Sequence, residues 1–129
     1  MDANENSYCA TGRLATLWAS LPDVQEVHPV TENDNIIFDE IKEVLTRHGA
    51  LHRFGLNLLH RHFQLRDGEC ILETTDSGHR RQIIEVKKMV DVAGDNVMET
   101  QWAFDGTGTL VCVGYCDYNK GHRRVHNAR

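Results

Sequence analysis

Closely spaced turn signals divide the second half of the chain into runs of strand length. After Gly49, the tetrapeptides at 66–69, 76–79, 93–96 and 105–108 each combine Gly with Asp, the residues typical of tight turns. The runs between them are enriched in β-branched and aromatic residues, which favour strands. They predict strands near 53–65, 69–75, 81–91, 97–104 and 109–117. Because every connection is short, neighbouring strands are expected to be antiparallel.

Two segments before Gly49 carry apolar residues at helical spacing. The first spans 11–21 and ends before Pro22. The second, NDNIIFDEIKEVLTRHG, can be capped by Asn33 or Asp34 and has one apolar stripe, made of Ile37, Ile41, Val44, Leu45 and His48. The sequence therefore predicts an α+β fold, with two N-terminal helices packed on a curved antiparallel sheet of about five strands, as a roll or half-barrel.

One of these strands has a competing interpretation. A helical stripe also fits the segment 51–65, through Leu51, Phe54, Leu58, His62 and Leu65. Gly55 argues against that helix because glycine lowers helix stability. We prefer the strand and keep the helix as the alternative.

Length and charge bound the class of protein. A chain of 129 residues is typical of one domain, and we expect a flexible N-terminus at 1–10, a single α+β domain at 11–118 and a basic tail at 119–129. No apolar run is long enough to cross a membrane, and the N-terminus lacks the basic and apolar parts of a leader, so we expect a cytoplasmic protein. The net charge of −5 argues against nucleic acid as a partner, and a homo-oligomer remains open.

The stretch Leu58–Thr74, LLHRHFQLRDGECILET, carries the first candidate site. If Asp67-Gly68 forms the tip of a two-residue hairpin, His62 lies directly across from Glu73. His60 points to the same side as His62, because side chains alternate along a strand. The pattern predicts a cluster of His60, His62 and Glu73 as catalytic residues.

Two chemistries fit this cluster, and a structural polar patch is the alternative to both. In the first, His62 is a general base that Glu73 orients, with His60 as a second polar contact. In the second, the two imidazoles and the carboxylate bind Zn or Fe with coordination positions left for substrate. No cofactor is certain from the sequence.

Further residues are expected to line the same cavity for a small-molecule ligand. The lining residues of the first hairpin are expected on the same strand face as His60. On the last hairpin, Cys112 is expected opposite Gln101, and Cys116 opposite Val97. If the sheet curls, the two faces close over one pocket lined by Leu56, Leu58, Gln64, Glu99, Gln101 and Cys112. A one-residue bulge in either hairpin would reverse this assignment.

A second candidate site lies at the C-terminus. The residues CVGYCDYNKGHRRVH place Cys112, Cys116, His122 and His126 in a Cys-x3-Cys-x5-His-x3-His pattern, and four such ligands suit a structural zinc. Buried core thiols followed by a solvated tail are the alternative.

Three functions follow from these patterns. The first is a small isomerase, lyase or hydrolase that acts on a small organic molecule through the His-Glu pair, with metal assistance left open. The second is a non-enzymatic interaction module stabilised by structural zinc. The third is an accessory or regulatory domain whose helix IIFDEIKEVL docks on a partner. A shallow sheet with an exposed apolar helix face would favour the third.

Overall fold

The computed structural model describes residues 13–92 and 96–118. These residues divide into two compact units, of which the second is Leu21–His62 and the first contains the rest. The predicted N-terminal segment 1–10 and the predicted tail 119–129 lie outside the described residues. In the part that is described, no helix combines the length and the apolar character needed to span a bilayer.

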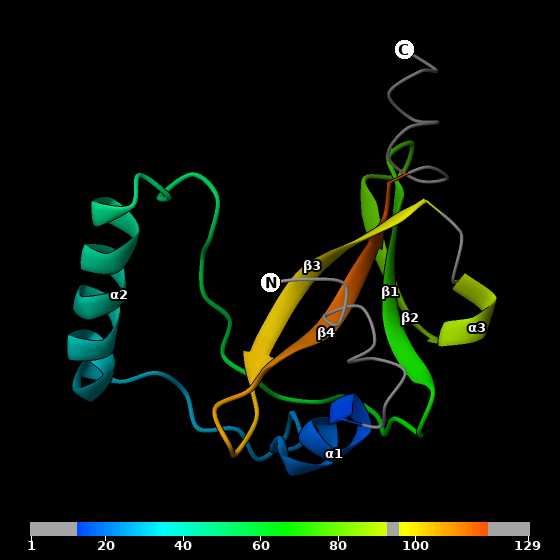
Figure 1. The fold of residues 1–129 in the computed structure, drawn as a ribbon, viewed down its shortest axis with the longest axis horizontal. Coiled ribbons are helices and arrows are strands. Elements are labelled where there is room, and N and C mark those ends of the chain that lie inside the picture. The colour runs from blue at the N-terminus through cyan, green and yellow to red at the C-terminus, as the bar shows by residue number, and fades with distance from the viewer. Residues whose placement is uncertain (1–12, 93–95, 119–129) are drawn as a thin grey trace. The chain divides into compact units, whose positions relative to one another are not determined.

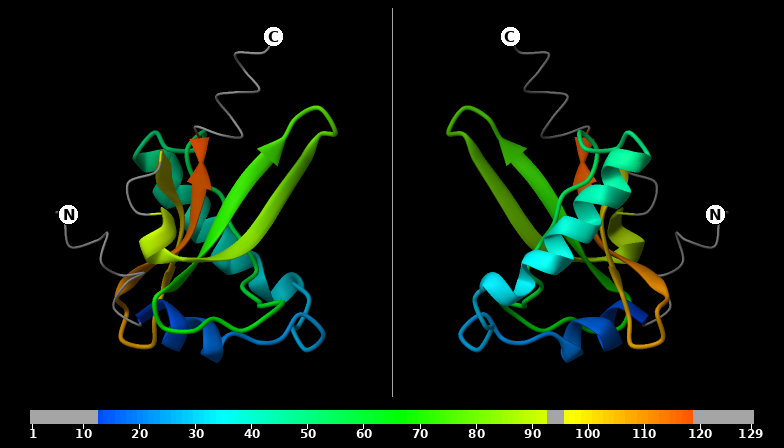
Figure 2. Two further views of the ribbon diagram at one scale, coloured as in Figure 1. Left: turned by 90° about the vertical axis from the view of Figure 1, so that its right-hand side faces the viewer. Right: turned by 90° about the vertical axis from the view of Figure 1, so that its left-hand side faces the viewer.

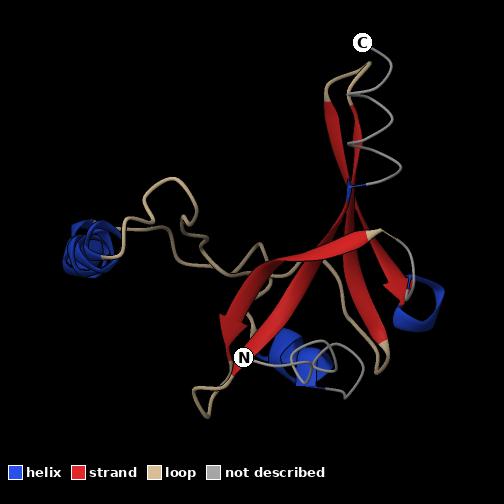
Figure 3. Cartoon of the chain, turned by 45° about the horizontal axis from the view of Figure 1, so that its top comes forward, coloured by secondary structure: helices blue, strands red, loops and turns tan. Residues whose placement is uncertain are grey.

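The first unit is built on a four-stranded sheet. Its strands are β1 (Glu69–Asp76), β2 (Arg81–Lys88), β3 (Val97–Phe104) and β4 (Leu110–Asp117). They follow the order β2-β1-β4-β3 and twist strongly (Figures 1 and 3). β1–β2 and β3–β4 are antiparallel pairs, and β1 and β4 are parallel. The α+β class is confirmed, whereas the prediction of five antiparallel strands is wrong.

β4 occupies the centre because it can be buried on both faces. Its sequence LVCVGYCD is almost continuously apolar, and the residues from Val111 to Asp117 are all buried. Strands with that pattern are found inside sheets with both sides covered, not at edges. The central position lets β4 pair with β3 on one side and with β1 on the other.

The strand predicted at 53–65 is not formed. Residues 54–60 belong to no helix or strand. The turn at its end does form, since the Glu69 amide donates to the carbonyl of Arg66 at 3.1 Å and Gly68 has φ 81°. That turn leads into β1, and β1 pairs with β2 and β4 on its two sides. Neither edge of β1 is left for an additional strand.

β3 has an irregular pairing with β4 that was not predicted. Glu99 pairs with Tyr115, Gln101 with Gly114 and Trp102 with Cys112, so the register shifts twice within four residues. The expected pairing of Cys112 with Gln101 is wrong because the loop is one residue longer than expected: Phe104 pairs with Leu110, which places Cys112 opposite Trp102.

Beyond the bulge the register also differs from the expectation. Cys116 lies opposite Met98, and Val97 lies opposite Asp117. The predicted pairing of Cys116 with Val97 is therefore wrong as well. The difference is one residue, and it moves the thiol next to a different side chain.

Two helices accompany the sheet in the first unit. α1 (Arg13–Ser20) contacts β4 near the β3–β4 loop and buries Leu14 and Leu17 (Figure 2). Trp18 stacks on Phe63 with ring centroids 6.2 Å apart, and its Nε1 donates to the Phe63 carbonyl at 2.7 Å. α3 (Met89–Val92) is a single turn that the sequence analysis assigned to the preceding strand.

The second unit contains η2 (Glu32–Asp34) and α2 (Asn35–Arg47). The expected helix α2 is present and begins after its N-cap residue Asp34, whose side chain does not cap it. Thr31 caps the preceding turn η2: its side chain accepts from the Asn33 amide, and Asp34 accepts from the Thr31 amide at 3.0 Å. This reciprocal arrangement is a capping box. Gly49 follows the helix with φ 64°, a conformation suited to glycine after a helix end.

Candidate functional site

The two predicted histidines lie close together in the second unit. The rings of His60 and His62 meet edge to face with centroids 5.0 Å apart. His60 Nδ1 is 2.7 Å from the carbonyl oxygen of Leu58. Because a carbonyl only accepts, Nδ1 carries the hydrogen, and Nε2 is the ring atom that can accept a proton or bind a metal.

Arg61, between these histidines, is anchored within the same unit. Its Nε donates to the carbonyl of Leu21 and its amide to the carbonyl of Pro22, both at 2.9 Å. Its own carbonyl accepts from the Val24 amide at 2.9 Å, and its guanidinium lies 3.9 Å from Asp23. These contacts fix the backbone between the two rings.

Glu73 belongs to β1 in the first unit, and its strand neighbours are Ile84 and Cys116. The predicted strand pairing of His62 with Glu73 is therefore wrong. The Cys116 thiol donates a hydrogen bond to Glu73 instead; burial and the negative charge of Glu73 raise the pKa of Cys116 to about 11. A protonated, buried thiol is inert as a nucleophile. The catalytic roles of His60, His62 and Glu73 stay predictions, but the hairpin from which they were predicted is not formed.

The predicted pocket residues are distributed over both units. Leu56 and Leu58 are 55% and 46% exposed in the second unit. Gln64 is exposed in the first. The remaining three lie on the β3–β4 hairpin: Glu99 Oε1 accepts from Trp102 Nε1 at 3.0 Å, Gln101 lies against Gly114, and Cys112 is fully buried.

The second candidate site is described only in part. Cys112 and Cys116 are buried on one face of β4, and Cys112 Sγ donates to the Gly114 carbonyl at 3.4 Å. His122 and His126 lie outside the described residues. Within residues 13–92 and 96–118, no three His, Cys, Asp or Glu side chains come together in a way that could hold a metal ion. The zinc assignment stays a prediction.

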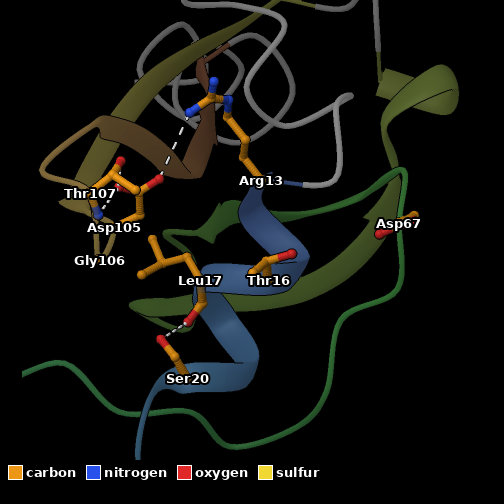
Figure 4. Close-up of a pocket in the computed structure, with 8 residues that line it drawn as sticks. All are labelled: Arg13, Thr16, Leu17, Ser20, Asp67, Asp105, Gly106 and Thr107. Atoms are coloured by element: carbon orange, nitrogen blue, oxygen red, sulfur yellow. Dashed lines mark hydrogen bonds and ion pairs between the residues drawn. The ribbon is translucent and has the colours of Figure 1, made fainter.

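An open hollow of about 620 Å³ lies between α1 and the β3–β4 loop (Figure 4). It is lined by Arg13, Thr16, Leu17, Ser20, Asp67, Asp105, Gly106 and Thr107. None of the residues predicted for a pocket is among them. The hollow was not predicted, because residues 105–108 were interpreted only as a hairpin loop.

Asp105 organises the rim of this hollow. Its Oδ1 accepts from the Thr107 hydroxyl at 2.6 Å and from the amides of Thr107 and Thr109 at 2.9 and 3.0 Å. These hydrogen bonds, led by that of the Thr107 hydroxyl, hold the pKa of Asp105 below its usual value. Arg13 adds an ion pair at 3.8 Å. The carboxylate is thus used to build the loop.

A larger exposed feature is the apolar side of α2, which we call the α2 stripe. At 100° per residue, its five members fall within about a third of the helix circumference. They are Ile37, Phe38, Ile41, Val44 and Leu45. No residue of α2 is buried; Ile37, Phe38 and Val44 are 52%, 37% and 44% exposed. Phe38 was not predicted as part of the stripe, although it precedes Ile41 by three residues and Leu45 by seven, which is helical spacing.

The two edge strands of the sheet carry exposed apolar side chains on one face. Ile84, Glu73, Cys116 and Met98 form one row across all four strands, so they share this face. Trp102 and Phe104 also lie on it, because they pair with Cys112 and Leu110. Ile84, Met98, Trp102 and Phe104 are 39–68% exposed, whereas Cys112 and Cys116 of the central strand β4 are buried.

Comparisons of the chain with protein-family models, with curated proteins and with solved structures gave no match.

Proposed function

We propose that this chain is a protein-interaction module that binds another protein through the α2 stripe. One observation carries the proposal: a helix of 13 residues has a continuous apolar side and no buried residue. Amphipathic helices in water normally cover such a stripe against a core. A stripe that stays exposed favours docking on a partner.

The spacing of the stripe suits recognition of a helix by a groove. Ile37, Ile41 and Val44 stand at positions i, i+4 and i+7, the anchors of an amphipathic helix in an apolar groove. Covering apolar surface contributes about 25 cal/mol for each Å² removed from water. The capping box begins the turn η2 directly before α2 independently of any partner, so less ordering would accompany docking.

Charge defines the chemistry of the expected partner. Residues 32–47 carry five acids and two bases, a net charge of −3. Glu40 lies next to the α2 stripe, about 40° around the helix axis from Val44. A groove with an apolar floor and a basic rim would complement this helix.

The other two functions remain predictions. A small-molecule enzyme with His62 as general base lacks the strand pairing that would bring Glu73 to it. A zinc-stabilised module depends on His122 and His126, which lie outside the described residues.

The proposal is tested with an apolar-surface dye, 8-anilinonaphthalene-1-sulfonate, and paired variants of α2. Ile37→Asp and Val44→Asp place a charge in the stripe and should lower dye fluorescence relative to wild type. Ile36→Asp is the matched control, because Ile36 is 64% exposed on the charged side of the helix. Thermal unfolding should be nearly unchanged in all three. Equal dye fluorescence in the stripe and control variants would reject the proposal.

A further inference from the structure

We infer that His60 and His62 together bind one divalent transition-metal ion of the kind that prefers imidazole, such as Ni²⁺, Cu²⁺ or Zn²⁺. The site lies wholly within the second unit, Leu21–His62. It needs only these two side chains, whereas the predicted cluster also included Glu73, which lies on β1 beside Cys116. Neither histidine belongs to α2, so the metal site is independent of the proposed function.

The distance between the two rings suits a shared ion. A metal bound to an imidazole nitrogen at about 2.1 Å lies roughly 3.2 Å from the centre of that ring. Two imidazoles on one ion, at a bond angle between about 90° and 109°, therefore have ring centres roughly 4.5–5.2 Å apart. The ring centroids of His60 and His62 are 5.0 Å apart, with the ring planes inclined at 76°. The two rings can therefore share an ion while the distance between them stays nearly the same.

His60 is already held in the form that metal ligands take. Its Nδ1 donates to the carbonyl oxygen of Leu58 at 2.7 Å, so Nε2 carries the free lone pair. Histidine ligands commonly donate their second ring N–H to a carbonyl in this way, which fixes the tautomer and the orientation of the ring. His62 is exposed, and exposed side chains change rotamer within ps–ns. Its ring can therefore turn a nitrogen toward an ion held by His60.

The backbone between the two rings is fixed before any ion binds. The Arg61 amide donates to the Pro22 carbonyl, and the Arg61 carbonyl accepts from the Val24 amide, both at 2.9 Å. The Arg61 side chain adds a hydrogen bond from Nε to the Leu21 carbonyl at 2.9 Å. Two ligands on an ordered backbone lose less conformational freedom on binding, and the second acts at a high effective concentration once the first has bound.

The ligand set defines which ions the site would take. Among the described residues, no third His, Cys, Asp or Glu side chain joins the pair, so water would fill the other coordination positions. Neutral imidazole suits Ni²⁺, Cu²⁺ and Zn²⁺, with Cu²⁺ bound most tightly. Ca²⁺ and Mg²⁺ take oxygen ligands and should not bind.

The site is tested by titrating the chain, without an affinity tag, with Ni²⁺ and recording amide NMR spectra, because the unpaired electrons of this ion broaden nearby signals. The signals of residues 60–62 should broaden first. In calorimetry, His60→Ala and His62→Ala should each weaken Ni²⁺ binding by about 100-fold, since the remaining imidazole loses its neighbour. His52→Ala is the matched control: it removes another exposed histidine of the same unit and should leave the affinity unchanged.

Three results would overturn this assignment. The first is no binding of Ni²⁺, and the second is equal affinity in wild type and His62→Ala. In the third, broadening affects His122 and His126 but not the pair, which moves metal binding to the C-terminus. Thermal midpoints without metal should be the same in wild type and variants, so that lost binding is not a sign of unfolding. If an alanine variant is destabilised, His62→Gln, which keeps a polar side chain of similar size, takes its place.

Discussion

The wild-type protein should lose stability at alkaline pH as the Cys116 thiol ionises, and Cys116→Ala should not show this part of the loss. Burial and the charge of Glu73 raise the pKa of this thiol from 9.0 to about 11. Between these two values the folded state keeps a proton that the unfolded state has lost. The stabilisation is therefore complete below pH 9 and is lost as the pH rises through 11.

The size of the stability loss follows from the shift in the pKa of Cys116. Two pKa units correspond to about 2.7 kcal/mol at 1.36 kcal/mol per unit. At pH 11, where half of the folded thiol has ionised, the loss should reach about 2 kcal/mol. Because Glu73 is partly exposed, solvent screens part of its charge, and about 2.7 kcal/mol is the upper limit of the effect.

Urea unfolding at pH 8 and pH 11 measures this contribution. Lysines and tyrosines titrate in both proteins, so the difference in free-energy loss between wild type and Cys116→Ala isolates the thiol. Glu73→Gln should reduce the loss partly, because the amide can still accept a hydrogen bond but has no charge. If wild type and Cys116→Ala lose the same free energy, Cys116 is not held against Glu73, and the β1–β4 pairing would be in question.

Three further changes test the core, a tight contact and a turn. Leu14→Ala should lower the free energy of unfolding by about 2–5 kcal/mol in urea, because Leu14 is fully buried. Gly114→Ala should cost about 1–3 kcal/mol, since the new methyl group would meet the Gln101 side chain, and adding Gln101→Ala should recover part of this loss. Asp76 accepts hydrogen bonds from Arg81 and His79, which lower its pKa from 3.8 to about 2. Thermal midpoints should therefore fall less between pH 4 and pH 2 in Asp76→Asn than in wild type.

Local signals in the sequence located most elements. The strands expected at 69–75 and 97–104 agree with β1 and β3 to within one residue. The run 81–91 extended too far, because Met89–Val92 forms a helical turn in place of strand. Alternation and turn residues act over short distances, so they fix where strands begin and end better than they fix what each strand pairs with.

Pairing between strands could not be read in the same way. The turn at 66–69 predicted a hairpin and does form, yet the chain before it is not a strand. The pairing of β1 with β4 joins segments about 40 residues apart, and short connections gave no reason to expect it. One signal was available: the continuous apolar run of β4 is typical of a strand buried on both faces.

The candidate sites were predicted from strand pairings, and they differ in the structure because the pairings differ. Glu73 and Cys116, assigned to two different sites, lie side by side because β1 and β4 are neighbours. For α2 the periodicity predicted four of the five members of the α2 stripe, with His48 in place of Phe38. Periodicity states which residues share a side of a helix; it contains no information on what, if anything, covers that side.

The most direct test of the account is the alkylation rate of Val44→Cys, in a Cys9→Ser background, measured over a range of protein concentrations. The account predicts rapid alkylation of Val44→Cys in dilute solution, near the rate of Ile36→Cys. Protection of Val44→Cys that is the same at every concentration would contradict the claim that the α2 stripe is an exposed binding surface.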